Sequence, residues 1–169
     1  PGPAGDLPIR VYRPAGRPRP VFVYLHGGGW TLGDLDTHDT VCRRLSLAAN
    51  CMVVSVAYRL GPEFPYPAPM DDVVTAVRWV AANAEAIGSD PTRLALGGDS
   101  AGGNLTAGAA IRLRDEGGPR VDLQVLIYPA TLPQFEMLSF YENAEGYFLT
   151  TADVVWFWDN YLGPDPANR

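Results

Sequence analysis

The segment LALGGDSAGGN, residues 94–104, joins an apolar run to a run of small residues through a glycine-rich turn. Residues 94–98 have the pattern of a buried strand, and residues 101–114 have that of a helix. The turn between them reads G-x-S-x-G. A sharp strand-to-helix turn forces strained backbone angles on its central residue, and glycines on either side avoid clashes around it. The pattern therefore predicts that Ser100 is presented at the end of a strand, where its hydroxyl can act as a nucleophile.

A second glycine-rich segment, YLHGGGW at residues 24–30, lies upstream of this turn and continues another apolar run. Acyl transfer develops negative charge on a carbonyl oxygen, which backbone N–H groups can stabilise if they are already in place. Glycines allow the backbone to approach a substrate closely. We therefore predict an oxyanion hole made by the amides of Gly27, Gly28 and Ala101.

The remaining sequence alternates strand and helix patterns. Strands are expected at 7–14, 21–29, 51–60, 94–98 and 121–130, and helices at 37–49, 70–85, 101–114 and 150–163. Residues 17–20 and 88–93 are expected to be turns, and 61–69 an extended loop. Strands that are apolar on both faces and alternate with helices predict an α/β fold with a mainly parallel sheet flanked by helices. Thr150 and Asp153 are expected to form a capping box.

Composition narrows the possible partners. A chain of 169 residues with a net charge of -6 and no lysine fits one acidic domain, and it has no basic patch to neutralise nucleic-acid phosphates.

No apolar run approaches the ~18 residues of a membrane span, and the start has neither Met nor a signal peptide, so we expect a piece of a longer cytoplasmic protein. Cys42 and Cys51 are expected to be buried free thiols, and the two histidines exclude a histidine-rich metal site.

Three blocks occur in an order typical of one family: HGGGW at 26–30, YRLGPEFPYPAPMDD at 58–72 and GGDSAGGN at 97–104. With them the chain resembles the hormone-sensitive-lipase branch of the α/β-hydrolases, which includes bacterial carboxylesterases and arylacetamide-deacetylase-like enzymes. The resemblance implies an α/β-hydrolase fold, hydrolysis of small-molecule carboxylic esters with short to medium acyl chains, a Ser–Asp/Glu–His triad and no cofactor.

The resemblance also implies supporting roles. Asp99 is expected to support the turn that carries Ser100, and His26 to fix the glycine loop by hydrogen bonding. Buried salt bridges and hydrogen bonds around that loop are expected from Tyr58, Arg59, Glu63 and Asp71. Trp30 is expected either to form the floor of an acyl pocket or to pack in the core.

The triad is not complete in this sequence. In the α/β-hydrolase fold the acid and the histidine follow the serine along the chain, but no histidine follows His38. His38 precedes the serine and is predicted to be structural. No acid downstream follows a further strand of the expected kind, so none is assigned. The candidates include Asp122, Glu136, Glu142 and Asp153.

We therefore expect residues 1–169 to form one partial domain, with a cap-like insertion at about 130–169 and the C-terminal catalytic part outside the chain. A serine without a base is a poor nucleophile, so the chain alone is expected to show little esterase turnover.

The predicted function is that of a carboxylic ester hydrolase with Ser100 as nucleophile. One alternative is a non-catalytic, small-molecule-binding member of the same family, because plant gibberellin receptors resemble the esterases but lack the histidine. A peptidase or lactonase on the same fold is a third possibility, since a fold does not fix the leaving group. The aromatic helix at 150–163 is expected either to pack on the core or to line an apolar substrate pocket. Acyl length and oligomeric state are left open.

Overall fold

The computed structural model describes residues 1–16 and 19–168. They build a five-stranded sheet with the strand order β1-β3-β2-β4-β5. The strands are β1 (Ile9–Tyr12), β2 (Arg19–Leu25), β3 (Met52–Val56), β4 (Ser89–Asp99) and β5 (Leu123–Ile127). Only the β1–β3 pair is antiparallel, and the pairs β2–β3, β2–β4 and β4–β5 are parallel. The predicted α/β fold with a mainly parallel sheet is therefore confirmed.

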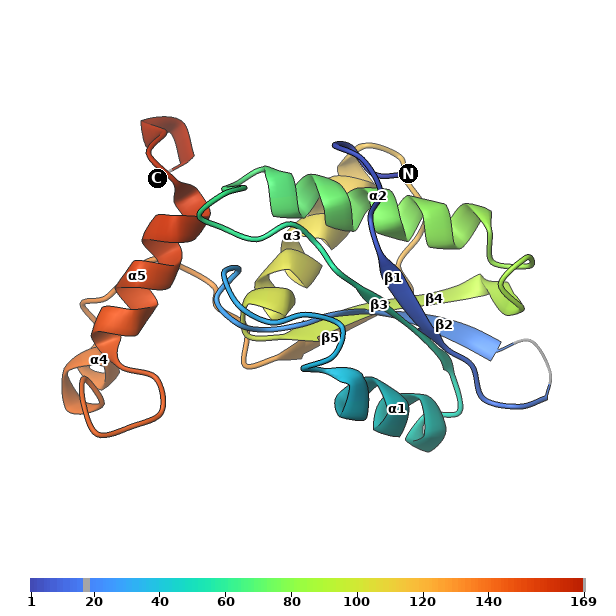
Figure 1. Ribbon diagram of the computed structural model, residues 1–169, viewed down its shortest axis with the longest axis horizontal. Coiled ribbons are helices and arrows are strands. Elements are labelled where there is room, and N and C mark those ends of the chain that lie inside the picture. Colours follow the sequence, from blue (N-terminus) through green and yellow to red (C-terminus); the bar gives the residue numbers. More distant parts are fainter. Residues whose placement is uncertain (17–18, 169) are drawn as a thin grey trace.

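Helices cover both faces of this sheet. They are α1 (Asp39–Ala48), α2 (Ala68–Ala82), α3 (Ala101–Asp115), α4 (Leu138–Glu142) and α5 (Thr151–Leu162), followed by the short 3₁₀ helix η1 (Pro166–Asn168). In Figure 1, α2 and α3 lie on one face and α1 on the other, while α4 and α5 stand together at one end of the sheet. That end is where β4 runs into α3.

The core has two parts because side chains alternate along each strand. Val21, Val23 and Leu25 of β2 join the cluster beneath α2 and α3, whereas Phe22 and Tyr24 join the cluster on the side of α1. The central strands are therefore apolar on both faces, as predicted. Both cysteines are buried and free, which confirms their predicted state.

The segment 121–130 contains a strand, β5, as predicted, but the prediction that this strand is buried is wrong. Leu123 is 58% exposed and Leu126 is 42% exposed. This strand pairs with β4 along one edge only, so part of its apolar surface remains uncovered. Burial here depends on neighbours and not on the strand's own apolar pattern.

Two predicted turns belong to strands instead. β4 begins at Ser89, which pairs with Arg19 of β2 across an irregularity in the register, so most of the stretch 88–93 is extended. Of the predicted turn at 17–20, Arg19 and Pro20 belong to β2, and residues 17–18 lie outside the described residues. The short helix α4 lies between β5 and α5, in a segment for which no helix was predicted.

The start of α5 forms as its sequence predicts. The Asp153 amide donates to Thr150 Oγ1 at 3.1 Å, and the Thr150 amide donates to Asp153 Oδ2 at 3.0 Å. This reciprocal pair is the expected capping box, and it satisfies two N–H groups that a helix start otherwise leaves without partners. The capping box therefore defines the residue at which α5 begins.

Candidate active site

Ser100 lies between β4 and α3 in a strained backbone conformation. Its φ of 53° and ψ of -117° are unusual for a residue other than glycine, and such strain is typical of functional sites. Its amide donates to the Ile127 carbonyl at 2.9 Å, and its carbonyl accepts from the Ala130 amide at 3.2 Å. The strained turn is thus held by the end of β5, and the hydroxyl stands at the positive N-terminus of α3.

Two flanking glycines are needed because another strand ends against this turn. A Cβ atom added to either Gly98 or Gly102 would overlap the carbonyl oxygen of Leu25, the last residue of β2. The G-x-S-x-G pattern therefore reflects close packing of three backbone segments as well as the turn itself.

The glycine loop continues β2 and turns back in left-handed conformations. The φ angles are 111° at Gly28, 57° at Gly29 and 56° at Trp30. The Gly28 carbonyl accepts from the amides of Thr31 and Leu32 at 3.1 and 2.8 Å, which closes the bend. The loop is thus a short, tight bend beside the serine turn.

One predicted oxyanion donor has another partner. The Gly27 amide donates to Asp99 Oδ1 at 3.0 Å, so this N–H group is not free to bind a substrate oxygen. That contact contradicts the predicted role of Gly27. In the part of the chain that the structure describes, the amides of Gly28 and Gly29 donate to no protein acceptor.

Asp99 joins the serine turn to the glycine loop. Its Oδ1 accepts from the Tyr24 hydroxyl at 2.6 Å as well as from the loop, and His38 Nε2 lies 3.6 Å away. Burial raises the pKa of Asp99, but the interaction with His38 and the hydrogen bonds from Tyr24 and from the loop outweigh it, so the pKa lies below its usual value. Asp99 is therefore charged at neutral pH and holds the loop by charge-assisted hydrogen bonds.

The two histidines have structural partners. His26 is buried, its Nδ1 lies 2.8 Å from the Gly27 carbonyl, and its ring stacks on Tyr58 with centroids 4.4 Å apart. The Tyr58 hydroxyl donates to the His26 carbonyl at 2.6 Å. Burial lowers the pKa of His26, so its imidazole is neutral and can donate to the loop. His38 lies beside Asp99 and Thr37.

The block at 58–72 supplies one buried ion pair, but its carboxylate is Asp72 and neither of the acids predicted to take part, Glu63 and Asp71. Arg59 binds both carboxylate oxygens of Asp72, at 2.8 and 2.9 Å, and Asp72 is buried. Asp71 pairs instead with Arg112 of α3, and Glu63 is exposed. Adjacent residues of a helix point about 100° apart, so only one of the two aspartates faces the core.

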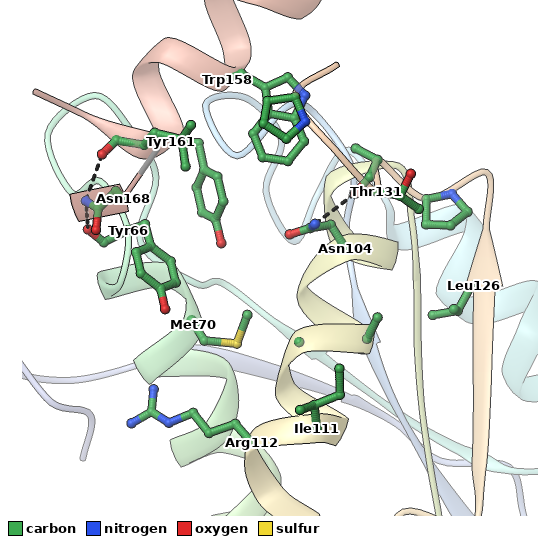
Figure 2. Close-up of a pocket in the computed structure, with 16 residues that line it drawn as sticks. Tyr66, Met70, Asn104, Ile111, Arg112, Leu126, Thr131, Trp158, Tyr161 and Asn168 are labelled. Atoms are coloured by element: carbon green, nitrogen blue, oxygen red, sulfur yellow. Dashed lines mark hydrogen bonds between the residues drawn. The ribbon is translucent and has the colours of Figure 1, made fainter. Parts of the chain in front are cut away.

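A cavity of about 360 Å³ opens beside Ser100. Its lining comes from the segment after β5, from α4 and from α5, and includes Leu132, Phe140 and Val154. A second cavity, of about 580 Å³, lies between α2, α3 and α5 (Figure 2) and does not include Ser100. Trp158 lines both cavities, so the aromatic helix packs on the core and also lines the serine cavity.

Trp30 packs in the core. It is 1% exposed, and its ring lies against the rings of Trp158 and Tyr161. Among the described residues, no group of three or more His, Cys, Asp or Glu side chains could hold a metal ion. None of the described helices combines the length and apolarity that a membrane crossing requires.

A family model described as the alpha/beta hydrolase fold matches residues 22–169, and the chain belongs to this family. It is 52% identical over 152 residues to "Carboxylesterase NlhH" of Mycobacterium tuberculosis, covering 89% of this chain and 47% of that protein. It is 41% identical to "Ethyl acetate hydrolase" of Pseudomonas putida, covering 96% of this chain and 52% of that protein.

Among solved structures, the hyperthermophilic esterase from the archaeon Pyrobaculum calidifontis matches with a TM-score of 0.94 and 44% identity, covering 99% of this chain and 56% of that one. The resemblance to the hormone-sensitive-lipase branch and its bacterial carboxylesterases is thereby confirmed. The chain spans about half the length of the curated relatives that it matches.

The contacts of Asp99 predict a pH-dependent contribution to stability. Replacing Asp99 with asparagine is expected to lower the free energy of unfolding at pH 7 by about 1–3 kcal/mol, because two donors lose a charged acceptor. Because the pKa of Asp99 is lowered in the folded state, its carboxylate contributes its full stabilisation above the ordinary pKa of 3.8. This contribution is lost as the pH falls through the lower pKa of the folded state. The difference between wild type and Asp99→Asn should therefore shrink toward pH 3.

Urea unfolding at pH 7, 5 and 3 measures this difference. The control is Asp36→Asn, because the Asp36 side chain is 83% exposed and its ion pair with Arg10 is expected to contribute less than about 1 kcal/mol. An Asp99→Asn difference that stays constant from pH 7 to pH 3 would show that the carboxylate charge does not hold the loop.

Proposed function

We propose that this chain supplies the nucleophile and the oxyanion hole of a carboxylic ester hydrolase. The observation that carries the proposal is the Asp99 carboxylate, which fixes the glycine loop next to the turn that presents Ser100. A strained serine, a neighbouring set of free amides and a cavity beside the serine are the parts that acyl transfer needs. The printed names of the relatives point to the same reaction class.

In the proposed reaction the Ser100 oxygen forms a bond to the ester carbonyl carbon, and the carbonyl oxygen takes up the negative charge. The amides of Gly28, Gly29 and Ala101 are proposed to bind this oxygen, with Gly29 in place of Gly27 because the Gly27 amide already donates to Asp99. The alcohol then leaves with a proton, and water hydrolyses the acyl-enzyme.

The base that takes the Ser100 proton is not assigned within these residues. His26 is held against Tyr58 and Gly27, and His38 lies against Asp99. We therefore propose that the histidine and the acid of the triad come from sequence outside these 169 residues. The cap-like role of residues 130–169 and the cytoplasmic location also stay predictions.

The proposed substrates are uncharged esters of small acyl groups. None of the described residues that line the serine cavity is Asp, Glu, Lys or Arg, and its walls are mainly apolar. Burying an unpaired charge there would be costly. A volume of about 360 Å³ fits short to medium acyl chains.

Fluorophosphonate labelling of the natural polypeptide that carries this chain tests the proposal. The expected result is one adduct, located by mass spectrometry on Ser100. Ser139 lines the same cavity but lies in the short helix α4, away from the glycine turn, and should stay unmodified. A protein that binds small ligands but is not labelled at Ser100 would instead support the non-catalytic, receptor-like alternative.

A further inference from the structure

The second half of the glycine loop needs support that Asp99 and His26 do not give. Gly28, Gly29 and Trp30 are all left-handed, and for Trp30 this conformation costs roughly 1–2 kcal/mol. Strained residues of this kind persist only where the surrounding structure holds them. Asp99 and His26 bind the loop at Gly27, and within the loop the Thr31 hydroxyl donates to the Gly29 carbonyl at 3.0 Å. Any further support for Gly29 and Trp30 therefore comes from a different element.

That element is α5, which lies against the loop through an aromatic face. The ring of Phe157 is so close to Gly29 that an added Cβ atom would overlap ring carbons. The ring of Trp30 stacks on that of Tyr161, with centroids 4.2 Å apart and planes inclined by 9°. The ring of Trp158 also packs on Trp30, with centroids 4.5 Å apart, and lies 6.0 Å from that of Tyr161. Figure 2 shows Trp158 and Tyr161 projecting from the same side of α5.

The helix is itself held in place against the loop. The Gly61 amide donates to the Trp30 carbonyl at 2.8 Å, and the Tyr66 amide donates to the Tyr161 carbonyl at 2.6 Å. The segment 61–66 therefore binds both the loop and α5. Asn168 donates to the Tyr66 carbonyl at 3.2 Å, one of the dashed lines in Figure 2. The three segments thus form one packed unit behind the glycine loop.

We propose that Phe157 is a positioning residue, which keeps the Gly29 amide directed at the substrate oxygen. The inference rests on the proposed function. An oxyanion hole works only when its donors already lie about 2.7–3.1 Å from the charged oxygen, and a misplacement of about 1 Å can cost a factor of roughly 10². Without the Phe157 ring, Gly29 has open space on that side and can relax.

The test compares kcat and KM of the natural polypeptide with those of Phe157→Ala, using p-nitrophenyl acetate and p-nitrophenyl hexanoate. We expect kcat to fall roughly 10- to 100-fold while KM changes less than about 3-fold, by the same factor for both esters. A residue that only shapes the acyl pocket would instead change the ratio between the two esters. The control is Phe148→Ala, whose side chain is fully exposed.

Three further variants keep the test decisive if Phe157→Ala folds poorly. Phe157→Tyr retains the ring and should restore most of the lost kcat. Gly29→Ala should be strongly impaired because its methyl group meets the ring, and removing the ring in Gly29→Ala/Phe157→Ala should recover part of the loss. If the double variant recovers no activity, this inference alone is overturned. The same holds if Phe157→Ala has an unchanged kcat while Ser100 is still labelled in wild type. Absence of a Ser100 adduct in wild type would overturn the proposed function and this inference with it.

Discussion

Replacing Ser100 with alanine is expected to lower the kcat of the natural polypeptide for p-nitrophenyl acetate by at least about 10⁴-fold. Ser100 stands at the N-terminus of α3 next to the glycine loop, with its backbone held by Ile127 and Ala130. The variant keeps the amides that would bind the oxyanion but has no atom to form the acyl-enzyme. The remaining rate should be the small acceleration that binding and the oxyanion hole provide alone.

Initial rates under saturating ester measure this loss. The matched control is Ser89→Ala, at the other end of the same strand, β4, where the buried hydroxyl has no hydrogen-bond partner among the described residues. Its kcat should stay within about 2-fold of wild type. If Ser100→Ala retained a tenth or more of the wild-type rate, the hydroxyl would not be the nucleophile.

Replacing Gly102 with alanine is expected to lower the free energy of unfolding by about 3 kcal/mol, at the upper end of typical overpacking effects. The added methyl group would overlap the Leu25 carbonyl oxygen and would also approach the His26 carbonyl oxygen to 2.7 Å. These are backbone atoms at the start of the glycine loop, so the clash can be relieved only by moving α3 or the loop. Activity should therefore fall together with stability.

Gly108 of the same helix provides the comparison. A Cβ atom there would meet only the terminal methyl of Met70, at 2.5 Å, and this flexible side chain can move. Alanine is also favoured over glycine within a helix by about 1 kcal/mol, so Gly108→Ala should remain within about 1 kcal/mol of wild type. Urea unfolding of both variants measures the contrast. Equal stability of Gly102→Ala and wild type would show that β2 and the serine turn are not in close contact.

The sequence is informative where a local rule decides the structure. Strands that are apolar on both faces predict the parallel sheet, and the G-x-S-x-G turn requires glycine for reasons that lie within a few residues. The glycine loop could be located from its sequence, but its hydrogen bonds could not. The Gly27 amide is bound by Asp99 because β2 and β4 pair with Leu25 opposite Gly98, and this register is not visible in either strand alone.

The dependence on contacts between distant segments also explains the other differences between the predictions and the structure. Whether Asp71 or Asp72 faces the core depends on the rotation of α2 about its own axis, since adjacent residues point about 100° apart. The apolar residues of β5 are typical of a covered strand, but its exposure depends on segments that lie beside it. The contact between Phe157 and Gly29 joins two distant parts of the chain, and no periodicity in either part indicates it.

The contact of Gly98 and Gly102 with the Leu25 carbonyl has a consequence for protein design. Copying the pentapeptide GDSAG into another strand–helix junction would transfer the bend but not the neighbour against which it fits. A host scaffold would need an adjacent parallel strand that terminates at the same level and continues into its own glycine-rich segment. Candidate scaffolds can be screened for that arrangement before any residue is exchanged.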